Sequence, residues 1–269
     1  TRNFEWIVGG NIAKSTAKLK ALGGEKQVIL DGNYNGMQLV NRVGESPYQF
    51  YGYQADGVFS TQAEADEAAL VNRTGRSYSA GDVRFVDQNG DHRIDDKDRV
   101  LLGSASPDYF GGFYTQLKYK GLALSAEFSY SKGNMAYNAV RQQLESMSTT
   151  NNQSLSVLNR WTVDGQKTDV PRARWKDPVG NSYFSSRWIE DASYLRLKNV
   201  TLSYTFSKTV WNFFRSGTLY VTGENLLTFT DYLGMDPEFS SSYSENVQGL
   251  DYGKLMQPKT VKVGVNLKF

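Results

Sequence analysis

The last eleven residues, KTVKVGVNLKF, alternate strictly between apolar and polar or glycine positions. A period of two is that of a β-strand with one apolar face. Chain ends usually fray in solution, yet the alternation continues to the final residue. The end of the chain is therefore predicted to be a strand that pairs with a neighbour and turns an apolar face toward an apolar medium. The residues of that face are Val261, Val263, Val265, Leu267 and Phe269.

The same alternation recurs in residues 113–119 and 122–130, which are separated only by Lys120 and Gly121. Two alternating runs with a two-residue linker of this kind predict a β-hairpin. Strands of about nine residues have the length that a tilted strand needs to cross a bilayer.

Further strands are predicted at residues 193–207 and 217–230, and a weaker one at 3–15. The change of phase at Lys198 and Asn199 predicts a bulge. Counting all alternating segments gives about seven or eight strands. The segments between them are long for the loops of a closed barrel with only eight strands. Because an incomplete barrel leaves edge strands unpaired, the chain is predicted to be part of a larger barrel.

Long polar segments lie between the strands at residues 57–108, 131–186 and 231–256, whereas the other connections are short. Long loops at one end and short turns at the other are typical of an outer-membrane β-barrel. Two helices are predicted inside these segments, at 61–74 and 139–148.

Composition excludes several other classes of protein. Lys and Arg number 30 against 28 Asp and Glu, so no excess of positive charge favours nucleic acid. Cysteine is absent and His92 is the only histidine, which removes thiolate sites and most histidine chemistry. No run approaches the 18 apolar residues of a transmembrane helix. Aromatic residues make up 13% although the mean hydropathy is -0.51, a combination typical of a membrane barrel with long polar loops.

Five stretches, in order, resemble the SusC/RagA family of TonB-dependent outer-membrane transporters of Bacteroidetes. They are YGYQADGVF (51–59), GDVRFVDQNGDHRIDDKDRVLLGSASPDYFGGF (81–113), WIEDASYLRLKNVTLSYTF (188–206), VTGENLLTFTDYLGMDPE (221–238) and the final VKVGVNLKF. Because they are spread over nearly the whole chain, they are far more specific together than any one alone.

The resemblance implies an all-β fold in which residues 1–269 form the C-terminal part of an antiparallel transmembrane barrel of about 22 strands with long extracellular loops. It also implies that the plug domain and the TonB box precede Thr1. Such transporters lie in outer-membrane lipid, pair with a SusD-like surface lipoprotein, and import oligosaccharides or peptides with energy from the TonB complex. The function expected for this chain is therefore nutrient uptake without catalysis. The alternative is a secreted soluble β-sandwich that binds calcium and carbohydrate.

Residues 87–98 have the spacing of a twelve-residue calcium loop, in which oxygen ligands stand at positions 1, 3, 5, 7, 9 and 12. His92 replaces the expected glycine, and an aspartate replaces the final glutamate. A structural calcium ion is one interpretation, and an Asx-rich turn held by its own backbone is the other. In the calcium interpretation His92 is an exposed turn residue, and the ligands are Asp87, Asn89, Asp91, the Arg93 carbonyl, Asp95 and Asp98.

Aromatic residues of the second long segment are candidates for substrate binding, because rings stack on sugars or grip peptides. They can equally form the loop's own core. The candidates are Trp161, Trp175, Tyr183 and Phe184, whereas Trp188, at a strand entrance, is predicted to be a membrane-interface residue. The terminal Phe269 is predicted to be an assembly signal as well as a lipid contact. Paired carboxylates such as Asp236 with Glu238 do not establish glycosidase geometry.

Overall fold

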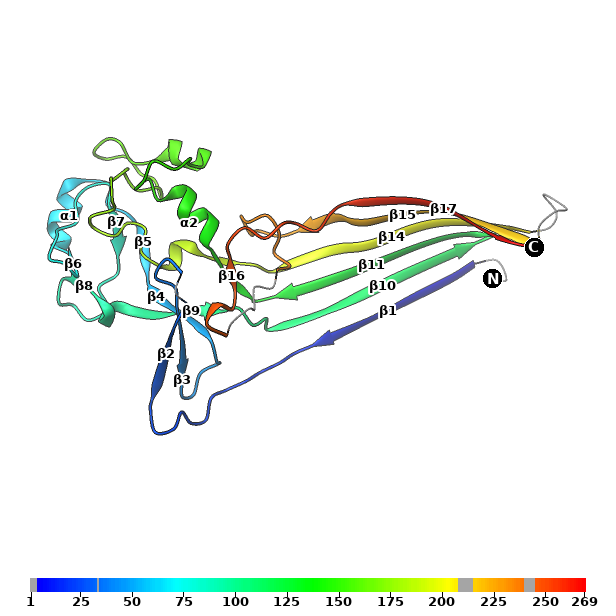
Figure 1. Ribbon diagram of the computed structural model, residues 1–269, viewed down its shortest axis with the longest axis horizontal. Helices are drawn as coiled ribbons and strands as arrows, with labels where there is room; N and C mark the ends of the chain where they lie inside the picture. Colours follow the sequence, from blue (N-terminus) through cyan, green and yellow to red (C-terminus); the bar gives the residue numbers. More distant parts are fainter. Residues whose placement is uncertain (1–3, 33, 208–214, 240–244) are drawn as a thin grey trace.

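A long twisted sheet and a loop domain at one end of it make up the chain (Figure 1). In this computed structural model, residues 4–32, 34–207, 215–239 and 245–269 are described. The long sheet has six antiparallel strands in the order β1-β10-β11-β14-β15-β17. They are β1 (Phe4–Ala13), β10 (Tyr109–Tyr119), β11 (Leu122–Lys132), β14 (Tyr194–Ser207), β15 (Ser216–Phe229) and β17 (Thr260–Lys268).

The predicted hairpin is confirmed as β10 and β11, with Lys120 and Gly121 both in the left-handed region (φ 46° and 90°). Left-handed geometry at both positions is what a two-residue hairpin turn requires. The bulge is confirmed as well, because the β14 to β15 register shifts between Leu197 and Asn199. On the β15 side of that shift, Asn225 is also left-handed (φ 52°).

The register places apolar side chains of all six strands on one face. One row runs straight across the sheet, from Trp6 through Leu117, Leu124, Leu202 and Val221 to Val263. The adjacent row, one residue along each strand, begins at Ile7 and continues through the polar residues Gln116, Ser125, Thr201, Thr222 and Lys262. Because neighbouring rows point to opposite faces, the sheet is apolar on one side and largely polar on the other.

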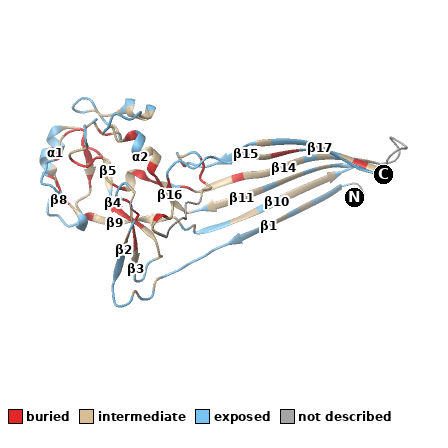
Figure 2. Ribbon diagram, viewed as in Figure 1, coloured by how far each residue is buried: buried red, intermediate tan, exposed pale blue. Residues whose placement is uncertain are grey.

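Among the described residues nothing covers the apolar face. Trp6 is 64% exposed and Val263 is 77% exposed. The β-sandwich alternative requires a second sheet packed on this face, so the arrangement does not support it. Figure 2 shows the contrast: buried residues gather in the loop domain, while the long strands are mostly intermediate or exposed.

The long sheet has six strands among the described residues, fewer than the predicted seven or eight. The weak strand predicted at 3–15 is β1, with Asn3 outside the described residues. No helix within the described ranges is both long and apolar enough to cross a membrane.

Three connections build the loop domain: the first joins β1 to β10, the second joins β11 to β14, and the third joins β15 to β17. All three lie at the same end of the sheet (Figure 1). Both predicted helices are present: α1 (Gln62–Ala68), capped by the Thr61 side chain, and α2 (Ala139–Glu145), capped by the Asn138 side chain. The short strands are β2 (Gln27–Asp31), β3 (Gln38–Arg42), β4 (Gln49–Tyr53), β5 (Ala55–Val58), β6 (Val71–Asn72), β7 (Val83–Phe85), β8 (Arg93–Ile94), β9 (Arg99–Ser104), β12 (Met135–Asn138), β13 (Ile189–Asp191) and β16 (Leu250–Asp251). Single turns of 3-10 helix lie at Asp96–Asp98, Leu155–Asn159, Ser186–Trp188 and Glu245–Val247.

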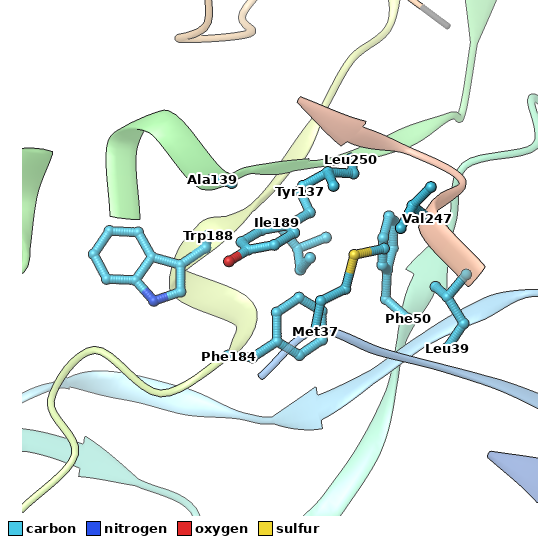
Figure 3. Packing of buried hydrophobic residues seen from close by; sticks show 10 residues of the cluster. All are labelled: Met37, Leu39, Phe50, Tyr137, Ala139, Phe184, Trp188, Ile189, Val247 and Leu250. Carbon is cyan, nitrogen blue, oxygen red and sulfur yellow. The ribbon is translucent and has the colours of Figure 1, made fainter. Parts of the chain in front are cut away.

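The main core of the loop domain draws residues from all three connections (Figure 3). The first connection supplies Met37, Leu39 and Phe50; the second supplies Tyr137, Ala139, Phe184, Trp188 and Ile189; and the third supplies Val247 and Leu250. A second core forms around Tyr53, Phe59, Phe85 and Ile94. Two of its strands, β7 and β8, lie farther from the long sheet (Figure 1). The long polar segments are therefore a folded domain with cores of its own.

Candidate functional site

An open pocket of about 550 Å³ lies in the loop domain. The first connection contributes residues around Asn35 and the three side chains Tyr53, Arg73 and Arg99. The second connection contributes the end of α2 and residues near Tyr183. Amides, hydroxyls, arginines and aromatic rings therefore meet at one concave surface, where polar groups can fix the orientation of a ligand.

Tyr53 and Tyr183 form the aromatic wall of the pocket, with ring centroids 5.7 Å apart. Each ring carries a guanidinium over its face: Arg99 lies 5.0 Å from the Tyr53 centroid and Arg73 lies 5.6 Å from the Tyr183 centroid. Burial raises the pKa of the Tyr53 hydroxyl, and the positive charge of Arg99 opposes that rise. The wall therefore combines apolar area with two cations.

The two arginines differ in how far they are already bound. Arg99 donates to Asp96 (3.0 Å) and to the Gln38 side chain (2.7 Å). Among the described residues, the Arg73 guanidinium makes neither an ion pair nor a side-chain hydrogen bond. Its five N–H donors are therefore available to a ligand.

Asp177 is the only carboxylate among the described lining residues, and its oxygens are already used. They accept hydrogen bonds from the backbone N–H groups of Asn181 (2.7 Å) and Ser182 (2.9 Å) and from the Ser182 hydroxyl (2.5 Å). Asp177 and the preceding Lys176 are both left-handed (φ 45° and 60°). Such residues cost on the order of 1–3 kcal/mol each, so these hydrogen bonds hold a strained corner of the pocket in place.

Gln142 connects α2 to the pocket wall. Its amide nitrogen donates to the Ser182 carbonyl (2.7 Å), and its amide oxygen accepts from the Tyr137 hydroxyl. Burial raises the pKa of Tyr137, so this hydroxyl stays a hydrogen-bond donor. The pocket is thus attached directly to the main core.

Two of the four predicted substrate residues line the pocket. Tyr183 belongs to its wall, and Phe184 is 3% exposed between the pocket and the main core. Trp161 lies elsewhere, with its indole N–H bonded to the Ser60 carbonyl (2.9 Å) and its ring packed against Gly81. Trp175 is 61% exposed, outside the pocket lining. Substrate binding by these four residues stays a prediction.

The interpretation of Trp188 as a membrane-interface residue is wrong. Its ring is fully buried in the main core, its indole N–H donates to the Tyr183 carbonyl (3.1 Å), and the Arg187 guanidinium lies 4.6 Å from its centroid. The prediction failed because the strand entrance at this point leads into the loop domain, not into the end of a wall strand.

The acidic loop is a chain of Asx turns. Asp87 accepts from the N–H groups of Gly90 (2.8 Å) and His92 (2.7 Å), and Asp91 accepts from the N–H of Arg93 (2.9 Å). Burial would raise the pKa of Asp87, but these hydrogen bonds outweigh it and lower the pKa. His92 is left-handed (φ 58°) and exposed, so it takes the turn that the calcium-loop pattern gives to glycine.

Asp98 closes the loop from inside the domain. Its side chain is fully buried, and its two oxygens accept from the N–H groups of Gln88 (2.9 Å) and Asp95 (2.8 Å). Burial raises the pKa of Asp98, although those hydrogen bonds oppose the rise. Over the described residues, no three acidic or histidine side chains converge on a common point. Asp98 serves the backbone of the loop in this structure, and metal binding stays a prediction.

Sequence reasoning missed the two arginines of the pocket, because no local pattern distinguishes them from other surface cations. It also noted Asp236 and Glu238 without their partners. Asp236 pairs with Arg196, and Glu238 pairs with Lys198 (2.9 Å). These carboxylates therefore hold the third connection against β14.

Comparison with known proteins gives the family context. No family model matches the chain. Over its full length the chain is 31% identical to TonB-dependent receptor P3 of Formosa agariphila and 25% identical to TonB-dependent receptor SusC of Bacteroides thetaiotaomicron. This chain is a homologue of the TonB-dependent receptors. It spans about a quarter of the length of these curated relatives, 27% of P3 and 25% of SusC.

Solved structures place the fold of this receptor homologue. The whole chain superposes on 28% of a chain in the structure of the RagAB peptide transporter, with a TM-score of 0.76 and 24% identity. It also superposes on 27% of a chain of the RagAB peptide importer in the open-open state, with a TM-score of 0.75 and 23% identity. The predicted fold class is therefore confirmed: the open sheet is part of a larger antiparallel β-barrel, with long loops at one end.

Proposed function

We propose that this chain forms part of the wall and loops of an outer-membrane receptor that imports nutrients with energy from the TonB complex. The observation that carries the proposal is the uncovered apolar face, which continues across all six strands. An apolar face of that extent is stable only against lipid or another apolar surface. The homology of the chain to TonB-dependent receptors favours lipid as the surface that covers this face.

The proposed partners follow from the same assignment. A SusD-like surface lipoprotein would lie over the loop domain, and the RagAB pair among the solved structures supports a two-protein arrangement. The TonB complex would act through the remainder of the receptor. The cargo is an oligosaccharide or a peptide, and the proposal contains no catalytic step. The membrane is the outer membrane of a Gram-negative bacterium.

Fractionation and uptake test this function. The full-length receptor should stay in the membrane pellet after carbonate washing and should dissolve in detergent. Cells should lose uptake of the cargo when either the receptor or TonB is deleted. Release by carbonate alone, or uptake that does not depend on TonB, would refute the proposal.

A further inference from the structure

The pocket of the loop domain has an excess of positive charge among its described lining residues. Arg73 and Arg99 line it with a single carboxylate, Asp177. The Asp177 carboxylate accepts hydrogen bonds from backbone N–H groups and from Ser182, and it forms no direct ion pair with either arginine. A ligand therefore meets two arginines, of which Arg99 is paired with Asp96 outside the lining and Arg73 makes no ion pair among the described residues.

We propose that Arg73 binds a carboxylate group of the imported ligand in this pocket. A guanidinium presents its donors in a planar fork that matches a carboxylate, and such charge-assisted pairs are stronger than neutral hydrogen bonds. The Arg73 guanidinium lies over the Tyr183 ring, 5.6 Å from its centroid. That contact holds the guanidinium at the pocket wall without consuming its donors.

The rest of the lining suits the same ligand. At and beyond the end of α2, the lining side chains Gln143, Thr149 and Asn151 can donate to a second oxygen or to polar groups beside the carboxylate. Gln143 uses one of its two amide N–H donors on the Tyr34 hydroxyl and keeps the other. Arg99 adds positive charge while staying tied to Gln38 and Asp96. A neutral sugar would instead favour an open aromatic platform, whereas here the Tyr183 face is covered by Arg73 and Tyr53 is buried.

This inference rests on the proposed function only in treating the ligand as cargo. A carboxylate reaches the pocket either as a peptide C-terminus or as a uronic acid of an oligosaccharide. Both sources have the same chemistry at Arg73, and the probes separate them.

The test uses detergent-solubilised full-length receptor and isothermal titration calorimetry. The probes are trialanine with a free C-terminus, trialanine amide, trigalacturonate and its methyl ester. In wild-type receptor at least one carboxylate probe should bind more tightly than its neutral partner. Its affinity should fall as ionic strength rises, because salt screens the ion pair.

Arg73→Gln should weaken binding of that carboxylate probe by roughly tenfold or more, because hydrogen bonds to charged groups contribute on that scale. It should leave the affinity for the neutral partner unchanged. Arg73→Lys keeps the charge and loses the planar fork, so its affinity for the carboxylate probe should lie between those of wild type and Arg73→Gln. Arg76→Gln is the matched control: this exposed arginine lies three residues away, outside the pocket lining, and its removal should change nothing.

Three results would overturn the inference: no binding of either carboxylate probe, equal losses for the charged and neutral probes, or equal losses for Arg73→Gln and Arg76→Gln. The thermal unfolding midpoint of Arg73→Gln should match that of wild type, which separates lost binding from lost folding. A receptor that binds the probe through Arg73 but does not import it would support the binding site. The same result would count against the proposed uptake function.

Discussion

Arg196 on β14 forms an ion pair with Asp236 of the third connection, and both side chains are almost completely buried, at 3% and 5% exposure. Arg196 also reaches Glu238 (2.9 Å), and the second Asp236 oxygen accepts from the N–H of Gln257 (2.9 Å). One buried cluster therefore fastens the connection between β15 and β17 to the rim of the sheet.

Removing one partner of a buried pair leaves an uncompensated charge, which costs about 3–5 kcal/mol. Arg196→Met should therefore lower the opening free energy of the third connection by that amount. Hydrogen exchange at the amides of Glu238 and Gln257 measures it. Lys118→Met is the control, because its pair with Glu5 (3.2 Å) is exposed and such pairs contribute about 0–1 kcal/mol. Equal effects of the two substitutions would contradict the assignment.

The same cluster predicts a loss of local stability in acid. Burial would raise the pKa of Asp236, but hydrogen bonds from Arg196 and from two backbone N–H groups outweigh it and hold the pKa below its ordinary value. A depressed pKa contributes stability that is present above the unfolded pKa, about 3.9 for aspartate, and is lost as the pH falls through the folded pKa. Opening free energies from exchange, corrected for intrinsic rates, should fall below about pH 4. Asp236→Asn should flatten that dependence.

The acidic loop allows a direct comparison of its two interpretations. Asp98→Ala leaves the N–H groups of Gln88 and Asp95 without their acceptor, at a cost of about 1–3 kcal/mol for each buried donor. The Asx-turn interpretation predicts this loss equally in Ca²⁺ and in EDTA. The calcium interpretation predicts that titrating Ca²⁺ into wild-type receptor releases or absorbs heat and that Asp87→Asn abolishes this signal. It also predicts that Ca²⁺ slows hydrogen exchange at the amides of residues 87–98. Absence of both signals would refute calcium binding.

The two tryptophans predicted to bind substrate should separate by their surroundings. Trp161→Phe removes the hydrogen bond to the Ser60 carbonyl inside the loop domain, so it should lower the melting temperature of the receptor. Trp175 is exposed, so Trp175→Ala should leave that temperature unchanged and lower cargo affinity only if the ring contacts cargo. Unchanged affinity in a stable Trp175→Ala receptor would end its role as a substrate residue.

The terminal phenylalanine is tested through assembly. Phe269 is 75% exposed beyond the end of β17, where it adds little packing to the sheet. Phe269→Ala should therefore reduce the amount of folded receptor in the outer membrane more than it reduces the stability of receptor already folded. Quantitative blotting of membrane fractions measures the first, and heat-modified gel mobility the second. Lys268→Ala is the neighbouring control, and wild-type yield from Phe269→Ala would refute the signal.

The long sheet was predictable from sequence because each of its strands alternates between apolar and polar residues with a period of two. Even irregularities had local signals, since the phase change at Lys198 and Asn199 marks the observed register shift. The number of strands was overcounted, at seven or eight against the six described in the long sheet. Short strands of the loop domain such as β4, which pairs with β3 and β9, were not predicted from sequence.

The loop domain and its pocket were much less predictable. Strands there are as short as two residues, as in β6 and β16, which is below the length at which alternation is visible. Trp188 packs with Met37 and Leu250, from connections far away in sequence, so its burial has no local signal. Arg73 gains its meaning only from Tyr183, 110 positions later. The acidic loop had a clear spacing, yet the same spacing serves Asx turns.

The shared core of the three connections has a consequence for how such receptors diversify. Phe50, Trp188 and Leu250 each come from a different connection and pack in one cluster. A chimaera that exchanges one connection between homologues would pair mismatched side chains across that cluster. Specificity on this side of the barrel should therefore be inherited, and transplanted, as a set of three connections together.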